Sequence, residues 1–576
     1  MHETVMNTIQ TAYNGLQLKS LALTGIILSA CVLILTRILS GLQSRAGKTR
    51  DTTQPRRPGI VPYWIPWLGH SISFAQNHIG FLENARNRLN EAIFGIVIGG
   101  AEHNVVMSPS MIKSILTSKS VTTAPLIKHV SQKVLGDRGA FEKLKPPDHH
   151  VYVHNIPNQF MHEPALSQTS RAAARFIERE TPNLVTFSPA TIDQMVWERP
   201  GDIAVIEGTD QPVCEVDFFA LIRYFVGTAT TTSIFGQAIL ETFPGLLQDI
   251  WSIDDQFATL SMGPPRYLTP KISAAYIARD RLLDTLAVFH QALLLWDEGK
   301  DLGMEFRDLR DLEDVSEPIK KRVRMAKDLG LSPEASAPAH LALLWAMNGN
   351  SPNLVFYHLL HLYTDPTLLE EIRKEIAPFV MVLRPTREET GFPIMEAPRL
   401  SIDIDKLSEC ELLKATFYET LRLDSAGLSF RQLTADLTLT ETKEEAASAG
   451  RSMPQSYFLK NGELVIAPHG VVHNDLTYFS NPDQFDPLRF IRTDPNTGQK
   501  RARPETMTPF GGGVPACKGR AFAEKKILAL SAAIVSLWQV EPTNGKDLKI
   551  PEHKISSAAF LPKNDIRVRI SPRYPS

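Results

Sequence analysis

A single cysteine near the end of the chain has the surroundings expected of a metal ligand. Glycines and a proline flank Cys517, at Gly511, Gly512, Gly513, Pro515 and Gly519. These residues exclude a helix interior or a regular strand, so the segment is a loop whose backbone can closely approach a large flat group. Residues 521–530 are predicted to form a helix, and a helix N-terminus stabilises a thiolate. Although a cysteine alone is more often an inert core residue, these neighbours favour an axial ligand of a heme iron.

The same loop carries a family pattern. Phe510, Gly513, Cys517 and Gly519 fit Phe-x-x-Gly-x-x-x-Cys-x-Gly, which resembles the heme-binding loop of the cytochrome P-450 monooxygenases. The resemblance implies a cytochrome P-450 fold and heme b, with Cys517 as the axial thiolate on the iron. The family usually has Arg or His two residues before the cysteine, where it reaches a heme propionate. This chain has Pro515 there, so the propionate needs another cation.

Arg431 is the main candidate for that cation. It follows a predicted helix and leads into a predicted sheet, and it resembles the family's strand arginine that pairs with a heme propionate. The sequence leaves a solvated arginine as an equally open alternative.

A carboxylate and two arginines are predicted to form a structural cluster. Glu419 and Arg422 are three residues apart on a predicted helix, so their side chains are neighbours. Such a pair is usually a weak surface salt bridge. Downstream, residues 485–490 resemble the family's aromatic-x-x-Pro-x-Arg-Phe region. The resemblance implies that Glu419 lies between Arg422 and Arg489 and holds the coil behind the cysteine loop, a structural role.

Residues 341–360 predict a long apolar helix with an interruption. Pro352 cannot donate a hydrogen bond to the Asn348 carbonyl and its ring clashes there, so the helix must open. Gly349 weakens the helix further, and gaps of this kind often line functional sites. The freed Asn348 carbonyl and Ser351 are predicted to hold a water molecule in the gap.

This segment resembles the family's central helix, which crosses the distal face of the heme. The family's usual Ala/Gly-Gly-x-Asp/Glu-Thr supplies an acid and an alcohol for proton delivery. Here Ala346 matches, Gly349 replaces the acid and Asn350 replaces the threonine. The resemblance therefore implies catalytic roles for Gly349, Asn350 and Ser351, with Asn350 orienting water. The variant is similar to the sterol 7- and 12-hydroxylases and prostacyclin synthase.

Three function classes follow from these residues. The resemblance extends over residues 56–576 and favours a monooxygenase whose substrate is hydrophobic, polycyclic and sterol- or terpenoid-like. The enzyme would use dioxygen and take NADPH electrons from a cytochrome P-450 reductase. The resemblance also allows cytochrome b5 as a further partner. Loss of the acid–alcohol pair instead favours a heme-thiolate isomerase or dehydratase that takes a peroxide and needs no reductase. A non-catalytic heme protein is the third class, and no feature supports it.

A cluster of basic residues follows the cysteine. The cluster is either a solvated helix face or a docking patch for an acidic flavoprotein reductase. It comprises Lys518, Arg520, Lys525 and Lys526.

The N-terminal region predicts a membrane anchor. Residues 21–36 carry no charge, near the short end of what spans a bilayer, and arginines and lysines follow. No small-x-small cleavage site supports the rival signal peptide. We expect a lumenal N-terminus at 1–20, a transmembrane anchor at 21–37, a linker and proline-rich hinge at 38–70, and a catalytic domain at 71–576. These boundaries predict a single-pass protein of the endoplasmic reticulum with a cytoplasmic catalytic domain.

Composition and element order limit the remaining possibilities. A net charge of -2 without a basic stripe argues against nucleic-acid binding, and four widely spaced cysteines argue against a disulfide scaffold. The elements predict a mostly helical α+β domain with small sheets, including a strand at 92–98 and a hairpin at 457–466 around Asn461-Gly462. Residues 296–327 are predicted to be a solvated connection. Residues 385–405 and 441–455 are predicted insertions, and they suggest specialised biosynthesis.

Overall fold

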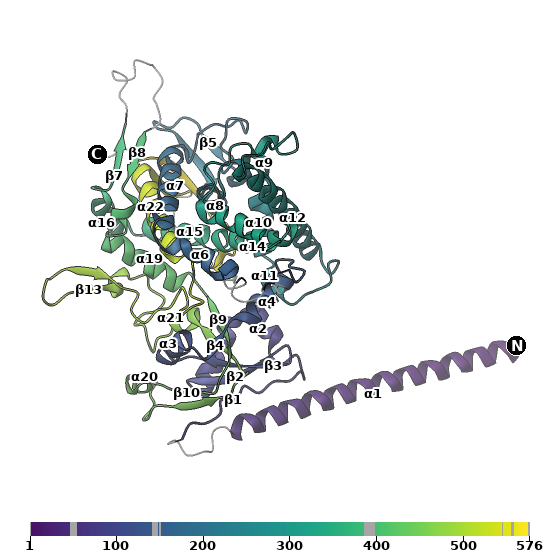
Figure 1. Cartoon of the computed structure of the whole chain (residues 1–576). Coiled ribbons are helices and arrows are strands. Elements are labelled where there is room, and N and C mark those ends of the chain that lie inside the picture. Colours follow the sequence, from purple (N-terminus) through teal and green to yellow (C-terminus); the bar gives the residue numbers. More distant parts are fainter. Residues whose placement is uncertain are drawn as a thin grey trace. The chain divides into compact units, whose positions relative to one another are not determined.

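The chain folds into two compact units. The computed structural model describes residues 2–46, 54–140, 144, 148, 151–384, 398–543, 545, 547–554 and 558–573, although not the side chains of 2–20, 45–46 and 153–154 (Figure 1). Unit 1 comprises residues 1–123 and 428–472, and unit 2 comprises residues 124–427 and 473–576. Most of the predicted insertion at 385–405 lies outside the described residues.

Unit 2 is built mainly from helices. The long ones are α7 (Ala165–Glu180), α8 (Phe218–Phe235), α10 (Leu246–Asp254), α12 (Pro270–Asp297), α13 (Glu317–Asp328), α14 (Pro333–Asn348), α15 (Ser351–Thr364), α16 (Pro366–Ile376), α19 (Glu411–Leu423) and α22 (Arg520–Leu537). Further helices are α4 (Ala124–Lys133), α6 (Ile156–Asn158), α9 (Ala238–Thr242), α11 (Phe257–Ser261), α18 (Ile404–Leu407) and η7 (Pro487–Phe490). All residues of α15 except the last are buried, which explains why its sequence is apolar on every face.

Small sheets complete unit 2. An antiparallel sheet has the order β15-β18-β6-β5, formed by Trp538–Pro542, Arg567–Pro572, Val213–Asp217 and Ala204–Ile206. Three further antiparallel pairs are β7 (Val380–Leu383) with β8 (Arg399–Ile402), β13 (Ile491–Thr493) with β14 (Lys500–Ala502), and β16 (His553–Lys554) with β17 (Leu561–Pro562). The prediction of a mostly helical α+β protein with small sheets is confirmed.

Unit 1 contains a six-stranded mixed sheet. Its order is β1-β2-β3-β12-β9-β4, formed by Gly59–Ile60, Ile93–Ile98, Ala101–Val106, Leu464–Pro468, Leu428–Leu433 and Val121–Thr122. A separate antiparallel pair joins β10 (Leu437–Thr440) to β11 (Ser456–Leu459). The helices are α1 (His2–Ala46), α2 (Ser71–Leu89), α3 (Pro109–Thr117) and α20 (Lys443–Ser448), and α21 (His469–His473) follows β12. The strand predicted at 92–98 is confirmed as β2.

Two local predictions were wrong. The expected hairpin at 457–466 does not form, because β11 pairs with β10 whereas β12 pairs with β3 and β9. The turn itself exists, with a φ of +86° at Gly462, but the strands on either side join different sheets. The expected solvated connection at 296–327 contains α13, whose Ile319 and Val323 are buried. Most of the charged residues of α13 lie on one face of an amphipathic helix, and the apolar residues on the other face are buried.

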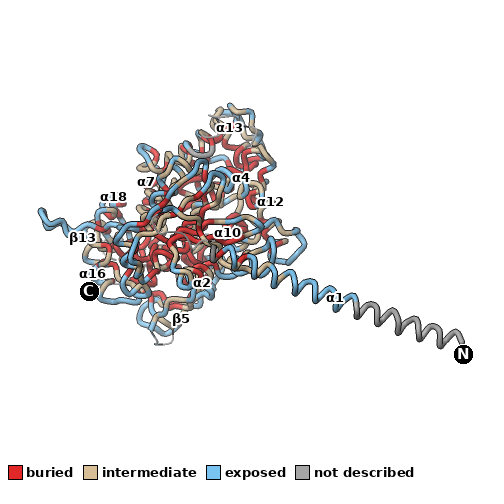
Figure 2. The backbone as a smooth tube through the Cα atoms, turned by 90° about the horizontal axis from the view of Figure 1, so that it is seen from below, coloured by how far each residue is buried: buried red, intermediate tan, exposed pale blue. Residues whose placement is uncertain are grey.

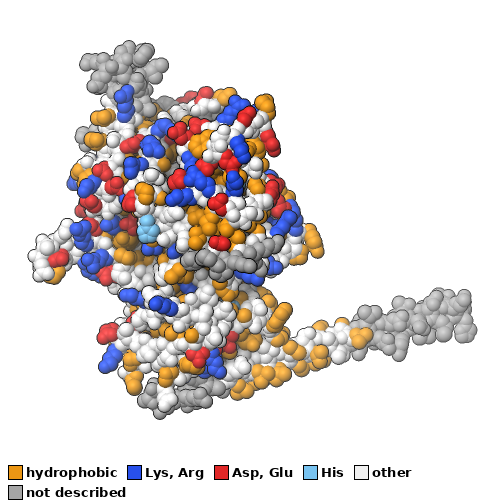
Figure 3. Space-filling model, viewed as in Figure 1, with side chains coloured by type: hydrophobic (Ala, Val, Ile, Leu, Met, Phe, Trp, Pro, Cys, Tyr) orange, Lys and Arg blue, Asp and Glu red, His pale blue; other side chains and the backbone are white. Residues whose placement is uncertain are grey.

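The N-terminal helix α1 is longer than the predicted anchor. Its apolar part, Leu21–Ser44, is long enough to cross a membrane, and its described side chains are largely exposed (Figures 2 and 3). The helix continues to Ala46 without a break at residue 37, so the start of the predicted linker is helical. Among the described residues, α8 is also long and apolar enough to cross a membrane. It is mostly buried in unit 2 and is therefore a core helix.

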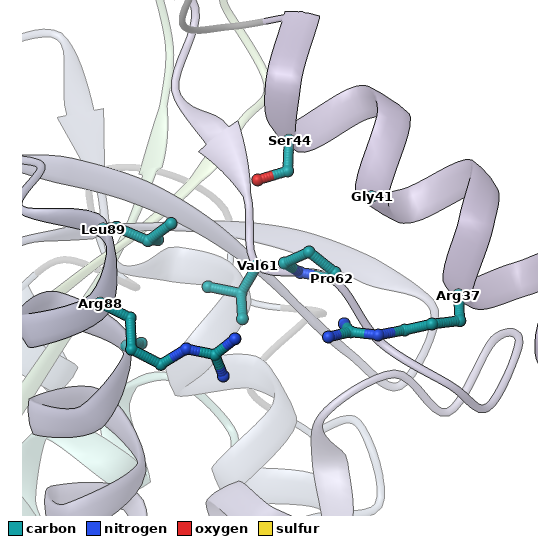
Figure 4. Close-up of a pocket in the computed structure, with 8 residues that line it drawn as sticks. Arg37, Gly41, Ser44, Val61, Pro62, Arg88 and Leu89 are labelled. Carbon is teal, nitrogen blue, oxygen red and sulfur yellow. The ribbon is translucent and has the colours of Figure 1, made fainter.

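The end of α1 packs on the segment after β1. Ser40 Oγ donates to the Tyr63 carbonyl at 3.2 Å, and the Tyr63 N–H donates to Ser40 Oγ at 3.1 Å. Beside this contact, a cavity of about 360 Å³ is lined by residues that include Arg37, Val61 and Arg88 (Figure 4). None of the predicted site residues lines this cavity.

Candidate active site

The cysteine loop leads directly into α22. The Cys517 N–H donates to the Phe510 carbonyl at 2.9 Å and closes the loop, and Gly511 and Gly513 have φ values of +67° and +68°. Side chains rarely adopt such angles, which explains the glycines at these two positions. Cys517 is exposed, so its sulfur can bind a metal ion of a group from outside the chain.

The electrostatics of Cys517 fit a metal-bound thiolate. Although the residue is exposed, the protein around its sulfur removes water and raises the pKa of the Cys517 thiol. The N–H groups of Gly519 and Arg520 and the charges of Arg520 and Lys518 oppose this by stabilising the thiolate. A coordinated metal ion deprotonates a thiol outright. The N–H groups then remain to stabilise the anionic sulfur at the start of α22.

Arg431 is a buried cation in unit 1. It lies on β9 and is 6% exposed, and its Nη1 atom donates to the neighbouring Phe430 carbonyl at 2.8 Å. Within the described part of the chain its Nε atom has no hydrogen-bond partner. Burial lowers the pKa of Arg431. A buried guanidinium in this state fits an anionic ligand such as a propionate. Because Arg431 and Cys517 belong to different units, their joint contact with one heme stays a prediction.

The structure brings Glu419, Arg422 and Arg489 together in unit 2. Arg422 donates from Nε and Nη2 to the two carboxylate oxygens of Glu419, both at 2.8 Å, and Arg489 Nε donates to Glu419 Oε1 at 3.1 Å. Glu419 and Arg422 are fully buried. Arg422 Nη1 also donates to the His473 carbonyl, and the N–H of Asp486 donates to Glu419. The cluster therefore links α19 to the coil before the cysteine loop.

The predicted basic patch is not a continuous solvated surface. Lys526 is 1% exposed and donates to Thr230 Oγ1 at 2.6 Å, so it cannot contact a partner protein. Lys525 pairs with Asp405. Lys518 Nζ and Arg520 Nη1 donate to the Val514 and Cys517 carbonyls of the loop itself. The prediction was wrong for Lys526, because the spacing of four charges does not reveal that α22 buries one of its faces; docking of a partner on the other three stays a prediction.

The interruption of the central helix lies between α14 and α15, as predicted. Pro352 lies in the first turn of α15, where its missing N–H costs nothing. The Asn348 carbonyl that Pro352 leaves free accepts a hydrogen bond from Trp251 Nε1 at 3.4 Å. A protein donor thus contacts the carbonyl that we predicted to hold water.

Asn350 also has a protein partner. Its Oδ1 atom accepts a hydrogen bond from the Ala559 N–H at 3.0 Å, and Asn353 Nδ2 donates to the Ala559 carbonyl at 3.3 Å. These bonds attach the segment before β17 to the break in the central helix. Ser351 is buried beside them in the first turn of α15. The role of Asn350 in orienting water stays a prediction.

Sequence reasoning missed a carboxylate next to Gly349. Asp254, the last residue of α10, is 3% exposed and accepts a hydrogen bond from Trp345 Nε1 at 2.8 Å. A Cβ atom on Gly349 would lie 3.1 Å from Asp254 Oδ1. Asp254 lies 95 positions before Gly349, and no local motif marks it. Asp254 is three residues after Trp251 on α10, so the two side chains lie on the same face of that helix. This spacing was the only sequence signal that could have linked Asp254 to the break.

Comparison with known proteins agrees with this geometry. Residues 319–568 match the family model described as Cytochrome P450, a range that includes α14, α15, the Glu419 cluster and the Cys517 loop. The chain is 25% identical to the cytochrome P450 monooxygenase poxD of Penicillium oxalicum, over 86% of this chain and 90% of that protein. It is 23% identical to the human 7-alpha-hydroxycholest-4-en-3-one 12-alpha-hydroxylase, over 92% and 96%.

A third relative, cytochrome P450 7A1 of Oryctolagus cuniculus, is 22% identical over 95% of this chain and 97% of that protein. The family holds its heme through a cysteine thiolate, and the loop at Cys517 fits that role. The fold, the thiolate loop and these similarities agree: the chain carries a cytochrome P450 domain over residues 319–568 and is similar to cytochrome P450 monooxygenases over most of its length.

Proposed function

We propose that this protein is a membrane-anchored monooxygenase that hydroxylates or otherwise oxidises a hydrophobic, polycyclic substrate of the sterol or terpenoid type in specialised biosynthesis. The observation that carries the substrate class is the similarity to the human 12-alpha-hydroxylase over almost the whole of both chains. That relative's name includes a steroid ring system. The interrupted central helix has Asn350 where the family usually has its threonine and Pro352 two residues later, and this variant supports the same branch.

The residues of this chain bind and position the reactants. Heme held by Cys517 supplies the activation of dioxygen when it is bound. Phe510, Gly513 and Gly519 shape the loop, and Arg431 neutralises a propionate. The break around Gly349, Asn350 and Ser351 lies over the reacting centre, and Asn350 orients water there. Glu419, Arg422 and Arg489 hold the loop in register.

The electrons and the location follow from the same proposal. NADPH supplies electrons through a cytochrome P-450 reductase, with cytochrome b5 as a second donor. Helix α1 anchors the protein in the endoplasmic reticulum membrane with the catalytic domain in the cytoplasm, since basic residues follow its apolar part. The bilayer also concentrates a hydrophobic substrate.

A peroxide isomerase or dehydratase is the second candidate. One observation favours it: Asn350 Oδ1 is already bonded to the Ala559 N–H. Gly349 and Asn350 stand where the family has its acid and its threonine, so the central helix offers neither an acid nor a hydroxyl at these two positions. Such an enzyme rearranges a peroxide without added electrons and needs no proton delivery from this helix.

Reconstitution separates the two candidates. We expect turnover of sterol-like substrates by the purified holoprotein to require NADPH, reductase and dioxygen together. Cys517→His should remove both turnover and the carbon monoxide difference band of thiolate-bound heme. Turnover of a peroxide substrate without NADPH or reductase would instead establish the isomerase.

The anchor is tested on the full chain. We expect the protein to resist carbonate extraction from microsomes, and a glycosylation acceptor added before His2 to be modified in the lumen. Release by carbonate, or modification of an acceptor added after Pro572 instead, would contradict the proposed topology.

A further inference from the structure

The family's acid is missing from the central helix, but a carboxylate from another helix occupies its place. Gly349 has no side chain, and the space where its Cβ atom would extend is bounded by Asp254 Oδ1 at 3.1 Å and by Trp345 Nε1 at 3.4 Å. Asp254 Oδ1 and Trp345 Nε1 are themselves hydrogen-bonded at 2.8 Å. An aspartate or glutamate at position 349 would therefore extend toward the position where the Asp254 carboxylate already lies.

Helix α10 contacts the break through two residues on one face. Trp251 and Asp254 are three positions apart, so their side chains extend in the same direction. Trp251 donates to the Asn348 carbonyl, and Asp254 lies against Gly349, the next residue. Phe257, which follows α10, stacks on Trp345 with ring centroids 4.5 Å apart. These contacts hold α10, and with it the carboxylate, in a fixed position at the break.

The surroundings of Asp254 suit a group that exchanges protons. Arg223 Nη2 lies 3.9 Å from Asp254 Oδ2, so the two side chains form an ion pair at a distance too long for a direct hydrogen bond. Burial lowers the pKa of Arg223 itself. Asn348 is the last residue of α14, and its Oδ1 atom is buried without a hydrogen-bond partner within the described part of the chain. A buried unsatisfied acceptor favours a bound water.

We propose that Asp254 supplies from α10 the carboxyl group that the central helix lacks at Gly349, and that it delivers protons into the break between α14 and α15. In each transfer the O–H bond of the Asp254 carboxylic acid breaks and a water molecule in the break gains the proton. The carboxylate then regains a proton from solvent, and no electrons change hands. This inference rests on the proposed monooxygenase function, in which protons are consumed at that face of the heme.

Coupling of NADPH oxidation to product formation is the first test. Asp254→Asn keeps the shape of the side chain but carries no proton to give, so we expect product formation to fall by roughly 100-fold, with electrons diverted to hydrogen peroxide. Asp254→Glu should recover part of the coupling. Asp255→Asn is the matched control, because it removes the adjacent, more exposed carboxylate, and its coupling should stay within about twofold of the wild type.

An exchange of residues tests the position directly. Gly349→Asp alone places a second carboxylate beside Asp254, and we expect a lower thermal midpoint and less bound heme. Gly349→Asp combined with Asp254→Gly returns one carboxylate to the same space, and both the thermal midpoint and the coupling should recover relative to the single variants. If Asp254→Asn retains no heme, the double variant still tests whether the position of the carboxylate determines coupling.

Infrared spectroscopy gives a readout that does not depend on turnover. The difference between wild type and Asp254→Asn should contain the C=O band of a protonated carboxyl group, and this band should shift in D₂O because its O–H proton exchanges with solvent. The inference is overturned if this band does not exchange, if Asp254→Asn couples like the wild type, or if the exchanged pair folds but couples no better than Asp254→Gly. If the wild type turns over peroxide without NADPH, the proposed function fails instead, whatever the infrared result.

Discussion

Two buried cations of unit 2 differ sharply in how they are neutralised. Arg422 is 0% exposed and uses its guanidinium nitrogens on both oxygens of Glu419, on backbone carbonyls and on Asn474. Lys526 is 1% exposed, and its one hydrogen-bonded acceptor among the described residues is the hydroxyl of Thr230. Burial lowers the pKa of Lys526 to about 7.

The difference follows from charge and geometry. A planar guanidinium can bind a carboxylate with two parallel bonds and still reach carbonyls, so a buried arginine with its carboxylate stays charged and fixes the segments around it. A buried amine beside a hydroxyl gains no opposite charge, so it responds by losing its proton. The Glu419 cluster therefore holds the fold together, whereas Lys526 reduces stability in a pH-dependent way.

The largest expected effect comes from removing the shared carboxylate. Glu419→Ala leaves Arg422 and Arg489 facing each other without an anion, which costs about 3–5 kcal/mol of unfolding free energy. That is a large part of the stability of a typical protein, so we expect little holoprotein to accumulate. Heme content and thermal unfolding provide the measurement. Glu409→Ala, which breaks an exposed pair with Lys406, is the control and should be nearly neutral. Normal expression of Glu419→Ala with full heme would show that the cluster does not hold the fold.

Replacing Lys526 should have the opposite sign. The amine binds its proton more weakly in the folded state than in the unfolded state, whose pKa is near 10.5. The unfolded chain therefore binds more protons between about pH 7 and 10.5, and stability should rise across that window by about 1.4 kcal/mol per pH unit. Lys526→Met should remove this slope and stabilise the protein at pH 7 by roughly 2–4 kcal/mol.

Chemical denaturation of both proteins at several pH values tests this prediction. Lys525→Met is the control, because it removes a neighbouring lysine from a partly exposed pair and should keep the slope. A wild-type stability that is flat between pH 7 and 10 would contradict the lowered pKa.

A smaller loss is expected from Arg489→Lys. Arg489 donates to Glu419 and also to the Ser480 carbonyl at 3.0 Å, and a lysine cannot make these bonds with the same geometry. We expect a loss of about 1–3 kcal/mol with heme retained, measured by denaturant unfolding. Arg492→Lys, at a more exposed pair with Glu505, should lose less than half of that. Equal losses in the two variants would mean that the guanidinium of Arg489 has no special role.

The smallest effect is expected from Thr230→Val. It removes the acceptor of the Lys526 hydrogen bond and should cost about 1 kcal/mol below pH 7, where the amine is charged. It should also lower the pKa of Lys526 further, which moves the start of the pH-dependent window to lower pH. The same denaturation series detects this shift. An unchanged window would show that Thr230 does not stabilise the charged amine.

The local features of the candidate site could be predicted because each rests on covalent chemistry at one position. Proline has no N–H, so the break before Pro352 follows from the sequence. Glycines at Gly511 and Gly513 indicate a tight loop ahead of Cys517. Glu419 and Arg422 must be neighbours on any helix, and the family pattern added Arg489.

Features that depend on long-range packing could not be predicted. The failed hairpin at 457–466 shows this, since the Asn461-Gly462 turn forms but each strand finds a better partner elsewhere. The burial of Lys526 and the helix at 317–328 depend on which face of a helix meets the core.

The sequence alone determined the thiolate loop, the opening of the central helix and the mostly helical fold, because glycine, proline and apolar periodicity act within a few residues. The tertiary structure decided which polar groups meet: Asp254 with Gly349, Asn350 with Ala559, and Lys526 with Thr230. These contacts join segments that are far apart in the chain. They are selected by the burial of many side chains at once, which no local pattern encodes.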